Sequence, residues 1–260
     1  MFSFVRRPRT SQVVGHAASV DRGKMLATDV ERFHKEGYLI VPDLFTNGEV
    51  VEWKRALQER IKNDDLLDEG AGVRVWFCHE MDELTTSHVT SNPKMRNVLQ
   101  HIIGPNVEFL SVKAVFKNAT TNFQSPWHQD WHYWHGSTKI SVWIALDDAT
   151  QENGCLRLIP RSHNSIVEME DVQDGKGFVH RIPEGAVCDQ PVTDAVVRAG
   201  DAIFFHDLTL HASCPNLNGK DRWSAIATYR DASKKDESTI WKSSILLSGE
   251  SVHFTTSRML

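Results

Sequence analysis

The sequence has few cysteines, no long apolar run and no excess of positive charge. Its 260 residues include only four cysteines, and no two of them form a Cys-x-x-Cys pair. Such a sparse set is typical of neither a disulfide framework nor a zinc-knuckle protein, so we expect a reducing, cytoplasmic setting. No apolar segment approaches the roughly twenty residues of a membrane-spanning helix. The net charge of -5 disfavours binding to nucleic-acid phosphates, and we expect neither nucleic acid nor membrane as a partner.

The first 24 residues differ in composition from the rest. Three arginines and several serines and threonines precede the first acidic residue, Asp21. This composition is similar to that of a mitochondrial presequence, but a flexible N-terminal arm over residues 1–24 is the commoner explanation. Residues 25–260 are enough to bury a substantial core, and we expect them to form a single domain.

Helical signals concentrate in the first hundred residues. The spacing predicts helices over residues 28–36, 47–63 and 93–103. Thr28 and Glu31 form a candidate capping box for the first, and Thr46 and Glu49 form one for the second. The Asn-Pro pair at 92–93 provides a cap and a first-turn proline for the third.

After Gly104 the apolar residues change from a helical period to alternation, which is typical of strands. Eight short strands with helices placed before them indicate a mostly β protein with N-terminal helices and a double-stranded β-helix (jelly-roll, cupin-like) core. The polar, irregular segment 164–195 is predicted to form a lid loop over the barrel mouth. The strands are expected at residues 107–117, 125–130, 139–146, 155–159, 196–198, 202–206, 209–213 and 222–229.

One short motif indicates chemistry. His128 and Asp130 lie two residues apart in a predicted strand, so their side chains should share a face. His211, about eighty residues later, can complete a set of two imidazoles and one carboxylate. Non-heme Fe(II) oxygenases use this set because it leaves about half of the coordination positions open. The alternative is an ordinary strand histidine beside a solvated acid. Three further histidines, His132, His135 and His206, are expected to be supporting or substrate-side groups.

An arginine follows this set at a fixed interval. Arg222 lies eleven residues beyond His211, and a guanidinium group can bind a carboxylate through two hydrogen bonds. The arginine therefore suits an acidic co-substrate, with a surface salt bridge as the alternative.

A series of segments, which follow one another in the same order as in the family, resembles the phytanoyl-CoA dioxygenase family of Fe(II)/2-oxoglutarate oxygenases. The resemblance covers roughly residues 26–230 and implies iron ligands at His128, Asp130 and His211. It also implies that Arg222 and Ser213 bind 2-oxoglutarate, with Trp143 beside it. Related halogenases replace the carboxylate ligand by Gly or Ala, whereas Asp130 is present here. The similar segments are 37–42, 127–134, 142–149, 153–163 and 200–216.

Candidate substrate contacts are Trp134, Gln124, His132 and Arg161. Trp134 shares the metal face by strand parity and matches a substrate-contacting aromatic of ectoine hydroxylase. Arg161 replaces the glycine of the family's Pro-Gly-Ser-His turn, which argues against a positive φ there; a solvated turn residue is the alternative to a substrate contact. Lys113 or Lys117 could face an anionic substrate. We expect a small or amino-acid-like metabolite rather than an acyl-CoA.

The resemblance implies a dioxygenase, an oxidoreductase that hydroxylates or otherwise oxidises its substrate. Its cofactors would be Fe(II), 2-oxoglutarate and O2, and 2-oxoglutarate would be decarboxylated to succinate and CO2. Two alternatives remain open at this point. One is a metal-dependent cupin-type isomerase or hydrolase, and the other is a non-catalytic jelly-roll binding module.

Overall fold

The computed structural model describes residues 11–13, 27–63, 73–80, 83–171 and 180–252. Within these ranges no helix combines the length and apolar character needed to cross a bilayer. Most of residues 1–24 and part of the predicted lid fall outside the described ranges. Ser11–Val13, inside the predicted arm, form β1, which pairs in parallel with β9 (Val192–Ala195).

The three predicted helices begin and end close to where the sequence places them, whereas the sequence does not predict the helix Glu83–Thr90. The capping box of Thr46 and Glu49 forms as expected, since the Glu49 carboxylate accepts bonds from the Thr46 backbone N and Oγ1. Asn92 caps the fourth helix by accepting a bond from Met95 N. The first box is wrong, because the helix already includes Ala27 and Thr28 therefore lies inside it. The bounds are α1 Ala27–Glu36, α2 Asn47–Asn63, α3 Glu83–Thr90 and α4 Pro93–Ile102.

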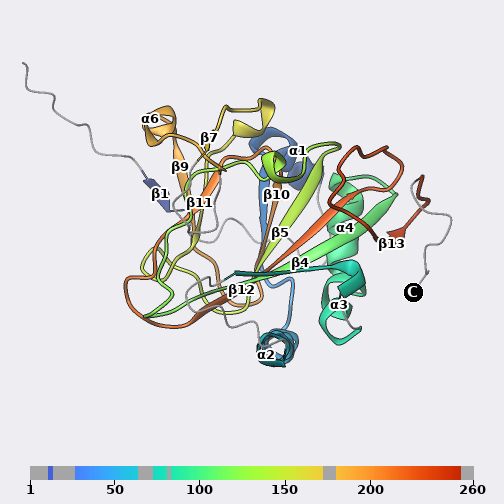
Figure 1. Cartoon of the computed structure of the whole chain (residues 1–260), viewed down its shortest axis with the longest axis horizontal. Helices are drawn as coiled ribbons and strands as arrows, with labels where there is room; N and C mark the ends of the chain where they lie inside the picture. The colour runs from blue at the N-terminus through green and yellow to red at the C-terminus, as the bar shows by residue number, and fades with distance from the viewer. Residues whose placement is uncertain (1–10, 14–26, 64–72, 81–82, 172–179, 253–260) are drawn as a thin grey trace, which may run out of the picture.

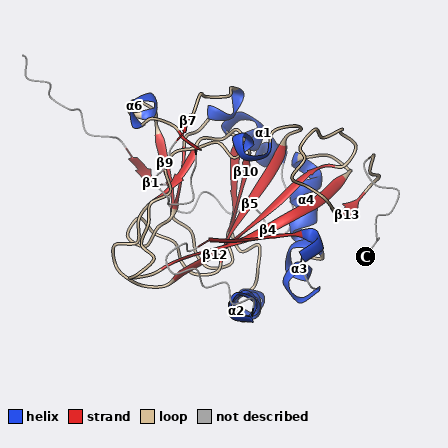
Figure 2. Ribbon diagram, in the orientation of Figure 1, coloured by secondary structure: helices blue, strands red, loops and turns tan. Residues whose placement is uncertain are grey.

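A large, mainly antiparallel sheet forms the centre of the molecule (Figures 1 and 2). Its described strands follow the order β13-β4-β12-β5-β10-β2, and β3 pairs with β4 outside this path. The sequence predicts β4 and β10 with the observed bounds, but it predicts neither β3 nor β13. The bounds are β2 Tyr38–Val41, β3 Val73–Phe77, β4 Val107–Lys117, β5 Lys139–Ala145, β10 Ala202–His206, β12 Arg222–Asp231 and β13 Ile245–Ser248.

A smaller sheet packs against one face of the large sheet. Its order is β1-β9-β6-β11, with β6 at Leu156–Leu158 and β11 at His211–Ser213. Figure 2 shows the small sheet and helices α3 and α4 on opposite sides of the large sheet. The two facing sheets confirm the predicted double-stranded β-helix.

Alternation along β5 divides the apolar residues between two cores. Val142 and Ile144 pack in the core between the large sheet and the helices. Trp143 and Ala145 point the other way and pack in the core between the two sheets, together with Leu158. This period of two builds the interior of the jelly roll, and it directs Trp143 toward the region that holds the site.

The segment predicted as an irregular lid contains regular structure. Its described part includes the paired strands β7 (Glu170–Asp171) and β8 (His180–Arg181), the short helix α6 (Glu184–Val187), and β9. Residues 172–179 lie outside the described ranges. The segment is tied to the metal motif, since Gln129 Nε2 donates to Ser165 O and Gln129 Oε1 accepts from Val167 N. Its role as a lid stays a prediction.

Candidate metal centre

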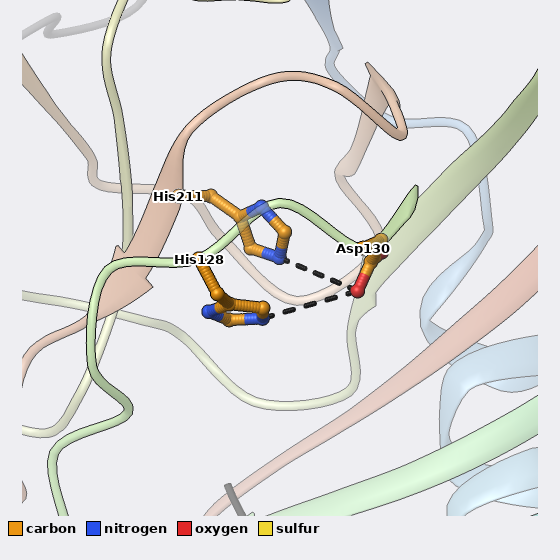
Figure 3. Close-up of side chains that lie close together, drawn as sticks. All are labelled: His128, Asp130 and His211. Atoms are coloured by element: carbon orange, nitrogen blue, oxygen red, sulfur yellow. Dashed lines mark ion pairs between the residues drawn. The ribbon is translucent and has the colours of Figure 1, made fainter. Parts of the chain in front are cut away.

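Three buried side chains converge at one end of the small sheet. His128 Nε2 and His211 Nε2 each lie 3.8 Å from Asp130 Oδ1, and Figure 3 shows both rings turned toward that oxygen. One potential ligand atom from each residue lies within 4.8 Å of the other two. A separation of 3.8 Å is too long for a hydrogen bond but shorter than two metal–ligand bonds of about 2.0–2.2 Å each. The three side chains therefore fit a shared metal ion.

Backbone carbonyls orient both imidazoles. His128 Nδ1 lies 2.8 Å from Pro126 O, and His211 Nδ1 lies 2.9 Å from Thr209 O. A carbonyl can only accept, so Nδ1 carries the proton and Nε2 presents its lone pair to the centre. His128 and His211 also exchange two backbone hydrogen bonds of 3.0 Å, which hold the two rings side by side.

A serine orients the carboxylate. Ser141 Oγ, on β5, donates to Asp130 Oδ2 at 2.9 Å. The other oxygen, Oδ1, is then left to face the histidines. Ligating carboxylates are commonly held in this way by an outer hydrogen bond, so the chain orients all three candidate ligands through its own hydrogen bonds.

The protonation states of the three groups suit a metal. Burial, followed by repulsion from His211, lowers the pKa of His128 to about 3. Burial also lowers the pKa of His211. Burial alone would raise the pKa of Asp130, but Lys113 and the two histidines hold it below its usual value. At neutral pH the centre offers two neutral imidazoles and one carboxylate.

The local backbone differs from the predicted strand over residues 125–130. His128 forms only an isolated bridge with His211, and Asp130 has helical angles (φ -60°, ψ -31°) at the start of α5, Trp131–Trp134. The argument from strand alternation is therefore wrong, although the residues that it selected do meet. They meet because the chain turns into α5 directly after the bridge.

The predicted 2-oxoglutarate residue Arg222 is a buried arginine. Arg222 Nη1 donates to Ser224 Oγ at 2.6 Å, and the guanidinium carbon lies 5.6 Å from the centre of the Trp143 ring. Arg222 Nε is buried and has no hydrogen-bond partner within the described residues. A buried guanidinium with an unused donor fits a carboxylate ligand. The alternative of a surface salt bridge is wrong, because Arg222 is only 1% exposed.

A second cation lies directly opposite this arginine. Lys117 on β4 pairs with Arg222 on β12, and its Nζ donates to Ser213 Oγ at 2.7 Å and to Cys214 O at 2.5 Å. Burial, followed by repulsion from Arg222, lowers the pKa of Lys117 to about 7. The sequence named Lys117 only as a group that could face an anion. Its position opposite Arg222 follows from strand register, which spacing does not reveal.

Two predicted substrate contacts are engaged within the protein. His132 Nε2 lies 2.9 Å from Val167 O, and Trp134 Nε1 donates to Asp207 Oδ2 at 3.1 Å. Both residues lie on α5, so strand parity does not place them on the metal face. Gln124 is exposed.

Arg161 corrects a second expectation. Its φ is +65°, so the arginine adopts the left-handed conformation that glycine favours instead of avoiding it. The side chain is exposed, and its Nε lies 3.6 Å from Glu36 Oε2. It therefore contacts α1 and not the metal centre.

Lys113 lies beside a group of aromatic rings that the sequence indicates only in part. Lys113 Nζ lies 5.4 Å from the centre of the Trp134 ring, and its charge acts on all three candidate ligands. Trp241, between β12 and β13, packs against Trp134 and against Phe77 of β3 at 5.7 Å between ring centres in each case. Trp241 lies far from the motifs, and no pattern in the sequence marks it.

Comparison with known proteins assigns the family. The model of the phytanoyl-CoA dioxygenase (PhyH) family matches residues 33–224. Among curated relatives, the L-proline trans-4-hydroxylase of Streptomyces griseoviridis is 27% identical over 229 residues, which cover 76% of this chain and 84% of the relative. The ectoine dioxygenase of Stutzerimonas stutzeri is 26% identical over 244 residues, covering 83% and 80%.

Solved structures agree in fold. The α-ketoglutarate-dependent carbocyclase SnoK of nogalamycin biosynthesis superposes with a TM-score of 0.67 at 22% identity, covering 83% of this chain and 88% of SnoK. The epimerase SnoN, solved with Fe3+, α-ketoglutarate and nogalamycin RO, has a TM-score of 0.64 at 22% identity, covering 79% and 83%. The chain belongs to the phytanoyl-CoA dioxygenase family and is a non-heme oxygenase that depends on iron and 2-oxoglutarate.

Proposed function

We propose that His128, Asp130 and His211 hold the iron and that Arg222, Lys117 and Ser213 bind the distal carboxylate of 2-oxoglutarate. The convergence of the three candidate ligands carries this proposal, because their protonation states and outer hydrogen bonds suit a metal. When bound, iron and 2-oxoglutarate supply the activation of O2, and 2-oxoglutarate is decarboxylated to succinate and CO2.

Each residue then has a defined task. Asp130 offsets one of the two charges of the metal ion, and the two neutral histidines leave the other for anionic ligands. The opposed cations Lys117 and Arg222 bind one end of a dianion, for which a buried guanidinium and ammonium are suited. The Trp143 ring covers the guanidinium and limits access of water to it. This scheme needs no side chain as a general base.

The substrate that we propose is a small molecule with a carboxylate and an apolar body. The reason for proposing a carboxylate on the substrate is Lys113, which is half-buried near the metal ligands and forms no ion pair within the described residues. A bound metal would take up the charge of Asp130 and leave Lys113 without a counter-ion. The reason for proposing an apolar body is the group of aromatic rings near Lys113, which belong to Trp134, Trp241 and Phe77. L-Proline, which one relative is named for, has this chemistry.

We propose hydroxylation as the outcome, since one curated relative is named for it. The family assignment removes the alternatives of a cupin-type isomerase or hydrolase and of a non-catalytic binding module. We also propose that the enzyme acts in the cytoplasm on a diffusible substrate, with neither nucleic acid nor a membrane as partner. The four cysteines, all free thiols, and the acidic net charge support this proposal. Fractionation of cells that produce the full chain would test the compartment.

The substrate class is tested by succinate release from the iron-loaded enzyme with 2-oxoglutarate and O2. A panel would pair small amino acids and other carboxylic acids with their uncharged amides. We expect release with some of the acids and little with the matching amides. Lys113→Met should remove the preference, whereas Lys62→Met, a change at an exposed lysine of α2, should keep it.

Two outcomes separate the parts of this proposal. Equal release with acids and amides, or an unchanged preference in Lys113→Met, would overturn the substrate class alone. In that case slow, substrate-independent succinate formation would still support the assigned metal and co-substrate sites. No succinate under any condition would contradict the residue roles as well.

A further inference from the structure

Two thiols face each other beside Lys117 and Ser213, two of the residues proposed to bind 2-oxoglutarate. Cys155 directly precedes β6 and Cys214 directly follows β11, and Cys214 N donates to Cys155 O at 3.0 Å. The two sulfur atoms are 3.9 Å apart. Cys155 is buried and Cys214 is partly exposed. The other cysteines, Cys78 and Cys188, donate instead to backbone carbonyls.

The register of the strands suits a covalent bond between these thiols. β6 and β11 are antiparallel, and Leu156 pairs with Ser213, so Cys155 and Cys214 are the next opposed pair. Opposed residues in antiparallel strands have Cα atoms about 4.5–5.5 Å apart, within the range of about 4.4–6.8 Å that disulfides require. Closing the 3.9 Å gap to a sulfur–sulfur bond of about 2.05 Å needs side-chain rotation together with a small approach of the two backbones.

The surroundings favour one thiol as the nucleophile. The Cys155 thiol donates toward Cys214 Sγ, and this contact, together with the charges of Arg157 and Lys117, lowers the pKa of Cys214. The pKa of Cys155 is raised by the same contact and by burial. The accessible sulfur therefore has the greater thiolate character, and a buried resolving thiol lies beside it.

The backbone next to the two cysteines contacts the Lys117 side chain. Lys117 Nζ donates to the carbonyl of Cys214 and to the Oγ of Ser213, which directly precedes Cys214. Gly154, the residue before Cys155, packs so closely that a Cβ there would lie 2.6 Å from Lys117 Cδ and 3.0 Å from Cys214 O. A shift of the backbone at either cysteine would therefore move the Lys117 ammonium group.

We propose that Cys155 and Cys214 are a redox-sensitive pair, which a hydroperoxide oxidises to a Cys155–Cys214 disulfide. This bond weakens 2-oxoglutarate binding by displacing Lys117 and Ser213. The second half of this proposal rests on the co-substrate site proposed above, whereas the first half does not. An oxygenase that activates O2 can release peroxide when its turnover is uncoupled, so such an oxidant is chemically close at hand.

The reaction balances in two steps. The Cys214 thiolate attacks the O–O bond of hydrogen peroxide, which gives a sulfenic acid and, after protonation of the departing hydroxide, one water. The Cys155 sulfur then displaces the hydroxyl from the Cys214 sulfur, forming the S–S bond and a second water. Two thiols lose two hydrogens and two electrons in total, and the peroxide is reduced. A thiol reductant reverses the change.

The covalent step is tested on the full chain loaded with Zn(II), which is redox-inert at the metal centre. After treatment with a small excess of hydrogen peroxide, intact mass under non-reducing conditions should fall by about 2 Da, the loss of two hydrogens per disulfide. Peptide mapping should join Cys155 to Cys214, and dithiothreitol should reverse the change. Cys155→Ala and Cys214→Ala should not form the bond, whereas Cys188→Ala should.

A pair that stays reduced, a bond that involves Cys78 or Cys188, or direct oxidation of Cys214 to a sulfinic acid would overturn the covalent step. The link to the pocket is tested by calorimetric titration of the same Zn(II) protein with 2-oxoglutarate. The oxidised form should bind about tenfold more weakly, as expected for loss of one charge-assisted hydrogen bond. Peroxide should not change the affinity of Cys155→Ala.

The outcomes separate this proposal from the proposed function. If the disulfide forms and the affinity is unchanged, the link through Lys117 is wrong. If the reduced protein does not bind 2-oxoglutarate at all, the co-substrate site proposed above is wrong, and mass and peptide mapping still decide the covalent step by themselves.

Discussion

Lys117 and Arg222 face each other on neighbouring strands of the large sheet, both 1% exposed and neither within ion-pair distance of a carboxylate in the described part of the chain. Two buried like charges without a counter-ion repel each other and are costly to desolvate. A dianionic ligand relieves both costs. This relationship leads to the first two predictions.

Lys117→Met should raise the KM for 2-oxoglutarate by about tenfold, since a charge-assisted hydrogen bond contributes about 1.5–3 kcal/mol. It should change kcat little, because Lys117 binds the end of the co-substrate that does not react. The same substitution should raise the free energy of unfolding of the ligand-free protein, because it removes a buried charge. Steady-state kinetics and urea unfolding would measure the two effects, with Lys94→Met on the exposed face of α4 as control. An unchanged KM would contradict the assigned role.

The affinity for 2-oxoglutarate should depend on pH through the same lysine. Its pKa is about 7 in the ligand-free protein, and the bound dianion favours the protonated form. Above about pH 7, binding must therefore take up a proton, and the affinity should fall by up to about tenfold per pH unit. Calorimetry in buffers of different ionisation enthalpy should detect this proton uptake. In Lys117→Met the dependence should disappear; a slope that persists would assign it to another group.

Ser141→Ala should weaken metal binding without changing the fold. Ser141 Oγ fixes Asp130 Oδ2, and loss of such an outer hydrogen bond typically costs about 10–100-fold in metal affinity. Competition titration with Co(II) and a chromophoric chelator would measure the change. Ser233→Ala, at an exposed turn, is the matched control. Equal affinities in the two variants would show that Ser141 does not position the ligand.

Arg161→Gly should stabilise the protein. Arg161 has a φ of +65°, and a left-handed conformation costs a residue with a Cβ about 1–2 kcal/mol. Its exposed ion pair with Glu36 contributes at most about 1 kcal/mol. We expect a small net gain in the free energy of unfolding, measured with urea. Arg161→Ala keeps the Cβ and loses the ion pair, so it should give no gain. A destabilised glycine variant would indicate that the side chain contributes more than this geometry suggests.

The sequence identifies the elements whose signals are local. Alternation places β4 and β10 at their observed bounds, and the capping residues Thr46 and Asn92 mark the starts of α2 and α4. The motif of His128, Asp130 and His211 is recognisable from the residue types and their order along the chain, so it could be found without coordinates.

The missed features depend on contacts that spacing does not encode. Strand parity failed from Asp130 onward because the chain there turns into α5, a short helix of aromatic residues and histidine that carries no helical signal of its own. Arg161 keeps a conformation favoured by glycine because the surrounding turn imposes it. Lys117 lies opposite Arg222 because of the strand register, and Trp241 packs on Trp134 because the chain beyond β12 folds back over α5. Only the folded structure shows these contacts.

The central claim is that one ion binds to His128, Asp130 and His211 with 2-oxoglutarate beside it. Anaerobic addition of Fe(II) and 2-oxoglutarate to the full chain tests it most directly, through the weak visible charge-transfer band of a chelated keto acid. We predict this band for the wild-type protein and for His101→Gln, an exposed control on α4, and we predict its loss in His211→Ala. A wild-type protein that binds both ligands without the band, or a His211→Ala variant that keeps it, would contradict the account.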